Sequence, residues 1–97
     1  MNVITDLPTA VGLHQWPSQT WAEVVSLASP ADEEQQAVLL RLLEIGFLPG
    51  ERVRVIAKGF PGSDPMAVRV GHTTFALRSH EAALIRVRAA SVDGSEA

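Results

Sequence analysis

Residues 39–50, LLRLLEIGFLPG, decide the fold of this chain because they join the end of a helix to a tight turn. Before the turn, Val38, Leu42 and Ile45 recur at the spacing of one face of an α-helix. Gly46 then predicts the helix stop, because the residue just past a helix end commonly has a positive φ. That conformation costs a non-glycine residue about 1–2 kcal/mol. The chain is therefore expected to leave the helix at Gly46.

The residues that follow have the composition of a type II turn. Pro49 presets the φ of the second turn position, and Gly50 tolerates the positive φ of the third. The chain would then reverse and present Leu48 at the corner. Gly46, Pro49 and Gly50 are the structural turn residues of this prediction.

The helix that ends before Gly46 is expected to cover residues 30–45. Ser29 is the predicted N-cap, and Pro30 suits the first helical position. The acidic residues at 32–34 would lie at the positive end of the helix dipole. Capping and the dipole explain this acidic cluster, so we do not expect a metal there.

Alternating apolar and polar residues predict strands on both sides of the helix. The five predicted strands cover residues 21–27, 52–58, 66–70, 73–78 and 84–88. Gly71-His72 has the composition of a two-residue hairpin loop, and residues 79–83 that of one helical turn. Short strands with one longer helix favour a mainly β fold closed, or nearly closed, into a small barrel.

This pattern also divides the chain. The barrel domain is expected over residues 21–88, preceded by an arm over 1–20 that packs on it and followed by a flexible tail over 89–97. Trp16 and Trp21 are the only tryptophans, and we expect core packing for them, at least for Trp16, rather than stacking on a ligand.

Composition limits the function further. A chain of 97 residues forms one domain, and the absence of cysteine excludes disulfides and cysteine-ligated zinc. No apolar run reaches the ~18 residues that span a bilayer, and the N-terminus has no secretory pattern. We expect a cytoplasmic protein without direct membrane insertion.

Charge is divided unevenly along the chain. Residues 1–51 carry seven acids and one base, whereas residues 52–88 carry seven bases and two acids. Arg52 and Arg54 share the outward face of the strand that leaves the Leu48 corner. An apolar side chain beside arginines predicts a partner-binding patch of these three residues. The alternatives are that Leu48 is part of the core and that the arginines only aid solubility.

No motif for catalysis is present, so we expect no enzyme and no catalytic or cofactor-binding residue. His72 and the adjacent pair His80-Glu81 are the candidates for a surface transition-metal site, which a crystal could fill adventitiously. Otherwise we expect neither a metal ligand nor a required cofactor. Phe60 is the one phenylalanine left for stacking on bases, which argues against nucleic acid.

Residues 42–53, LLEIGFLPGERV, closely resemble the helix–turn–strand signature of the FeoA family, the small cytosolic partner of the ferrous iron transporter FeoB. Asp64-Pro65, FALR at 75–78 and AALIRV at 82–87 match the rest of that pattern in order. The resemblance spans roughly residues 21–88 and implies an SH3-like barrel. It gives no role for the arm.

The resemblance implies an adaptor or activator that contacts the cytosolic, GTP-binding part of FeoB. Weak association of two copies of the chain into a homodimer is a further possibility. The alternative is a regulatory domain that binds Fe²⁺ or another transition metal directly, as in the C-terminal domains of iron-dependent repressors. Those repressors also need a helix-turn-helix domain, which these 97 residues do not contain.

Overall fold

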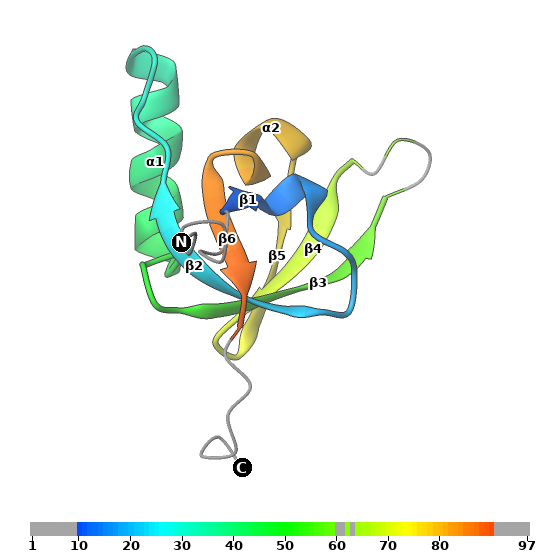
Figure 1. Cartoon of the computed structure of the whole chain (residues 1–97). Coiled ribbons are helices and arrows are strands. Elements are labelled where there is room, and N and C mark those ends of the chain that lie inside the picture. Colours follow the sequence, from blue (N-terminus) through cyan, green and yellow to red (C-terminus); the bar gives the residue numbers. More distant parts are fainter. Residues whose placement is uncertain (1–9, 60–61, 63, 91–97) are drawn as a thin grey trace, which may run out of the picture.

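Six strands form one antiparallel sheet in the order β1-β6-β2-β3-β4-β5 in the computed structural model, which describes residues 10–59, 62 and 64–90 (Figure 1). The strands are β1 (Val11–Gly12), β2 (Trp21–Leu27), β3 (Arg52–Lys58), β4 (Met66–Val70), β5 (Thr73–Leu77) and β6 (Ile85–Ala89). The helices are the 3₁₀ turn η2 (Leu13–Gln15), α1 (Glu33–Ile45) and the short α2 (Ser79–Ala82).

The sheet is open, which corrects the prediction of a small β-barrel. The five predicted strands are present, together with β1. Closure requires hydrogen bonds between the first and last strands of the sheet. Here β1 pairs with β6 over only two residues, and β5 pairs with β4, so each leaves one edge of the sheet unpaired.

The core lies on one face of the sheet. Alternation along the strands turns every second residue inward, and these inward residues are buried; among them are Val53, Val55, Val68, Ile85 and Val87. The turn at Leu13 adds a fully buried leucine from the arm. Trp16 packs against this core, as expected, but the same expectation is wrong for Trp21, which is 41% exposed.

The hairpin between β4 and β5 is confirmed at Gly71-His72. Gly71 has φ +63°, as the first loop position of a type II′ turn requires. After β5, the predicted helical turn is α2, and the Oδ1 atom of Asp64 accepts a 2.6 Å hydrogen bond from the amide of Ser79. This bond ties the start of α2 to the residues just before β4.

The helix α1 begins later than the sequence predicts, because Asp32 and not Ser29 is its N-cap. The Oδ1 atom of Asp32 accepts a 2.8 Å hydrogen bond from the amide of Gln35. The Gln35 side chain in turn accepts one of 2.8 Å from the amide of Ala31. These two bonds satisfy the amides of Gln35 and Ala31, which a cap at Ser29 would leave free at this point.

Contact between α1 and the rest of the protein is limited. Only Leu39 and Leu42 of its thirteen residues are buried. Figure 1 shows α1 standing at one side of the sheet, joined to it by the connections to β2 and β3. None of the helices in the described ranges is long and apolar enough to span a membrane. Phe60, residues 1–9 of the arm and residues 91–97 of the tail lie outside the described residues.

Candidate partner-binding surface

The end of α1 has the geometry that its glycine predicts. Gly46 has φ +126°, a region that residues with a side chain rarely adopt. The amide of Phe47 donates to the carbonyl of Leu42 and that of Gly46 to the carbonyl of Leu43, each at 3.1 Å. This pattern is a Schellman motif, which satisfies carbonyls that the helix end leaves free. It turns Phe47 into the core, where its side chain is fully buried.

The turn after Phe47 is the predicted type II turn. The amide of Glu51 donates to the carbonyl of Leu48 at 2.9 Å, and Gly50 has φ +94°. Two further bonds of 2.8 Å join this turn to β2, one from the Gly50 amide to the Val24 carbonyl and one from the Val24 amide to the Glu51 carbonyl. Backbone bonds therefore hold the corner in place.

Leu48 lies at this corner and is 45% exposed. The alternative that it is a core residue is therefore wrong. Two leucines of α1, Leu40 and Leu43, are also exposed. The exposed leucines lie on the last turns of the helix and on the corner that follows it. Of these, Leu43 and Leu48 lie closest to the corner and are the candidates for an apolar contact with a partner.

Arg52 and Arg54 lie on the solvent face of β3, because the alternate residues Val53 and Val55 are buried. The guanidinium of Arg54 lies over the ring of Trp21 on β2, 5.4 Å from its centroid. The two arginines thus lie on the solvent face of the sheet, as predicted, although both are half-buried. Trp21, which was expected in the core, lies on this face beside Arg54. Their contact with a partner stays a prediction.

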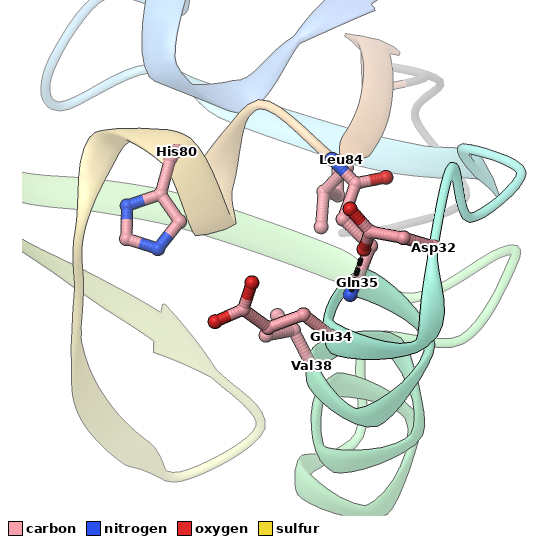
Figure 2. Close-up of a pocket in the computed structure, with 6 residues that line it drawn as sticks. All are labelled: Asp32, Glu34, Gln35, Val38, His80 and Leu84. Carbon is pink, nitrogen blue, oxygen red and sulfur yellow. Dashed lines mark hydrogen bonds between the residues drawn. The ribbon is translucent and has the colours of Figure 1, made fainter.

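A second feature is a cavity of about 310 Å³ between the start of α1 and α2. It is lined by Asp32, Glu34, Gln35, Val38, His80 and Leu84 (Figure 2). Figure 2 shows Glu34 and His80 on opposite sides of the cavity, while Asp32 is engaged by the amide of Gln35. Within the described residues, no group of three or more acidic or histidine side chains is arranged to hold a metal ion.

Next to this cavity, α1 and α2 are joined by an ion pair between Arg41 and Glu81. The other carboxylate oxygen of Glu81 accepts a 2.9 Å hydrogen bond from the amide of Arg78 and so caps α2. Burial raises the pKa of the Glu81 carboxyl, but these contacts and His80 together lower it by more, so the pKa lies below its ordinary value. Sequence reasoning missed this pair, because forty residues separate its members.

Comparison with known proteins places this geometry in a family. A model of the FeoA domain matches residues 11–89. The solved FeoA of Stenotrophomonas maltophilia, a complex with zinc, is 42% identical, and the match covers 80% of this chain and 89% of that chain with a TM-score of 0.71. FeoA from Chlorobium tepidum is 28% identical over 86% of this chain and 74% of that chain, with a TM-score of 0.68.

Regulatory proteins share the fold as well. A manganese-dependent transcriptional repressor is 27% identical, with a TM-score of 0.71, and the match covers 87% of this chain but 44% of the repressor. No curated protein sequence matches the chain. The Stenotrophomonas protein is described as an SH3 domain protein, so the SH3-like part of the fold prediction is supported although the sheet is open. Since the family model spans most of its length, the chain belongs to the FeoA family, which is associated with ferrous iron transport.

Proposed function

We propose that this protein is a cytoplasmic accessory protein of ferrous iron uptake that binds the cytosolic, GTP-binding part of FeoB and activates the transporter by contact. Its role is binding and not catalysis. Membership of the FeoA family supports this proposal, and the relative from Stenotrophomonas maltophilia is described as a candidate ferrous iron transport activating factor.

The observation that carries the proposal is the exposed Leu48 at a corner held by backbone bonds. A leucine presented on rigid backbone loses little conformational entropy when a partner buries it, so more of the apolar contact energy appears as affinity. Exposed Leu43, in the last turn of α1, extends the apolar surface on the helix side of the corner. Arg52 and Arg54 would steer an acidic partner toward it.

Substitution of Leu48 by serine tests this role. Because Leu48 is outside the core, Leu48→Ser should change the free energy of unfolding by no more than about 0.5 kcal/mol. Its affinity for the cytosolic domain of FeoB should fall about tenfold or more, which corresponds to about 1.4 kcal/mol. Thermal melting and calorimetric titration, with and without a guanine nucleotide, measure the two effects.

Leu40→Ser is the matched control, because Leu40 is 54% exposed but lies further up α1. A loss of affinity with Leu40→Ser and not with Leu48→Ser would move the contact from the corner to the helix. If the wild-type protein does not bind the FeoB domain in any nucleotide state, the adaptor function is wrong.

A metal-responsive regulatory domain is the second candidate function. The likeness to a manganese-dependent repressor favours it, together with the cavity that Glu34 and His80 border. We expect anaerobic titration calorimetry with Fe²⁺ to give no stoichiometric site of micromolar or tighter affinity. Such a site, if it were lost in both Glu34→Gln and His80→Ala, would favour the sensor over the adaptor.

A further inference from the structure

Two arginines face each other across the middle of the sheet. Arg54 on β3 is the direct register partner of Arg69 on β4. The Cβ atoms of such opposed residues lie about 4.5–5.5 Å apart, and like charges at this distance destabilise a sheet. Arg69 is exposed and forms no ion pair with any residue in the described part of the chain. Nothing among these residues neutralises the pair.

The side chain of Arg54 is nevertheless held in one position. Its Nη2 atom donates a 2.7 Å hydrogen bond to the Oε1 atom of Gln19, and its guanidinium lies over the ring of Trp21. Its Nε atom is buried and meets no acceptor within the described ranges. An arginine that serves only solubility would be free to rotate in water, so these contacts indicate a prearranged guanidinium.

Gln19, which accepts the hydrogen bond from Arg54, has a strained backbone conformation. Gln19 has φ +66°, the one positive φ outside glycine in the described residues, and such a conformation costs about 1–2 kcal/mol. Its amide donates to the carbonyl of Val55 at 2.7 Å, and its side-chain Nε2 donates to that of Ile56 at 2.6 Å. These two bonds fix Gln19 on β3, with its Oε1 aimed at Arg54.

Further arginines extend the positive charge over the same solvent face of the sheet. Arg88 lies on β6, where Glu23 of β2 is 3.6 Å from its Nη2 atom, and Arg52 lies on β3 opposite Glu23. Glu23 is the single acidic side chain of β2, β3, β4 and β6. Positive charge is therefore concentrated around Arg54 and Arg69, whereas the carboxylate of Glu23 lies between Arg52 and Arg88.

We propose that this face, centred on Arg54 and Arg69, binds a segment of a partner protein that presents neighbouring carboxylates. Guanidinium groups bind carboxylates in a bidentate manner, and a carboxylate between the two arginines would remove their mutual repulsion. The inference rests on the proposed function, because it names the chemistry of the surface by which FeoB would be recognised. It adds Arg69, Trp21 and Gln19 to the predicted patch.

An acidic protein segment fits this face better than other polyanions. The whole chain has a net charge of −3 and a pI near 5.5, whereas domains that bind nucleic acid are strongly basic. Trp21 is the one exposed tryptophan, and Arg54 already occupies a face of its ring. A stacking surface for bases is thus missing from the described residues.

Arg69→Glu is the test variant, because it has two opposite effects. It should place an acid opposite Arg54 and so leave the melting temperature unchanged or raise it. It should also weaken binding to the cytosolic domain of FeoB about tenfold or more at low salt, and much less at high salt. Lys58→Glu is the control: it also reverses one positive charge, but Lys58 ends β3 beyond a register shift and pairs with the buried Met66, away from the Arg54–Arg69 pair. This variant should retain nearly full affinity.

A peptide of ten glutamates probes the face without FeoB. In ¹H–¹⁵N spectra of the full chain it should shift the indole N–H of Trp21. The indole of Trp16, which donates to the carbonyl of Thr20 at 3.0 Å, should not move. Arg69→Glu should abolish the shift. If wild type binds the peptide but not FeoB, the proposed function fails and the acidic-segment site stands.

Three results would overturn the inference. In the first, FeoB binds wild type and Arg69→Glu equally well. In the second, the glutamate peptide leaves the Trp21 signal in place. In the third, an oligouridine or a vesicle of phosphatidylglycerol binds through Arg69 more tightly than the peptide does, which would assign the face to another class of partner.

Discussion

The sheet and the helix α1 differ in how many of their side chains are buried. In the sheet, inward residues such as Val55, Val68 and Ile85 are fully buried and pack from several strands into one core. In α1, only Leu39 and Leu42 of thirteen residues are buried, while Leu40 and others on the remaining faces meet solvent. Burial of each aliphatic side chain contributes about 1.5–3 kcal/mol, so the sheet supplies most of the apolar stabilisation.

The position of α1 therefore depends more on its two ends and on one ion pair than on burial of an apolar face. Asp32 caps its start, Gly46 ends it, and Arg41 joins its middle to Glu81 of α2. A helix held in this way leaves apolar surface free for a partner. The substitutions below test that contrast.

The largest effect is expected in the sheet. Ile85→Ala removes a fully buried side chain from β6 and should lower the free energy of unfolding by about 2–5 kcal/mol. Leu40→Ala, on the exposed side of α1, should change it by no more than about 0.5 kcal/mol. Urea unfolding followed by tryptophan fluorescence measures both. Equal losses would mean that α1 is packed as firmly as the sheet.

The junction between the two regions comes next. Gly46→Ala should cost about 1–2 kcal/mol, because alanine does not tolerate φ +126°. An added Cβ would meet nothing closer than Val70 at 3.9 Å, so the loss would come from the backbone and not from a clash. Gly46→Asn should lose less, since asparagine accepts positive φ more readily. An unchanged urea midpoint for Gly46→Ala would show that the helix does not stop there.

At the start of the helix, two substitutions separate the observed cap from the predicted one. Asp32→Ala should lower the free energy of unfolding by about 1 kcal/mol, since the Gln35 amide loses its acceptor. Ser29→Ala should have almost no effect. The reverse order, measured by thermal melting, would restore Ser29 as the cap.

The smallest effect is expected at the link between α1 and α2. Because the pKa of Glu81 is lowered in the folded protein, its carboxylate stabilises the fold fully at pH values above the ordinary pKa of 4.5. This contribution is lost as the pH falls through the lowered pKa. Arg41 is 53% exposed, so water screens the pair. Glu81→Gln should therefore cost about 1 kcal/mol or less at pH 7.

Urea unfolding of wild type and Glu81→Gln at pH 7 and at a pH below the lowered pKa checks this expectation. The gap between the two proteins should narrow in acid, because the wild-type carboxyl then becomes neutral as well. A gap that stays constant would assign the effect of the substitution to packing and not to charge.

How well the fold could be predicted depended on the range of the interactions. The five strands, the stop at Gly46 and the turns at Pro49-Gly50 and Gly71-His72 follow from local periodicity and backbone preference. The helix start was misplaced because Ser29 and Asp32 are both good caps. Gln35, three residues after Asp32, was the signal for the second, since glutamine at this position commonly accompanies an N-cap, and here its side chain accepts from the Ala31 amide.

For the candidate site, the sequence indicated Leu48, Arg52 and Arg54 but not the residues that lie beside them. Alternation along β3 places Arg52 and Arg54 outward, and the corner exposes Leu48. Pairing of Arg54 with Arg69, and its contact with Trp21, depend on the register between strands. That register is set across long stretches of chain, and no local pattern encodes it.

The sequence by itself determined where this chain bends and which residues face inward, because glycine, proline and strand alternation act over a few residues. Its motif order also identified the FeoA family, which the family model confirms. Only the tertiary structure decided that the sheet stays open, that Leu13 of the arm enters the core, and that two arginines meet without a carboxylate between them. Each of these outcomes depends on which distant strands pair and in what register, and that is settled when the whole core packs.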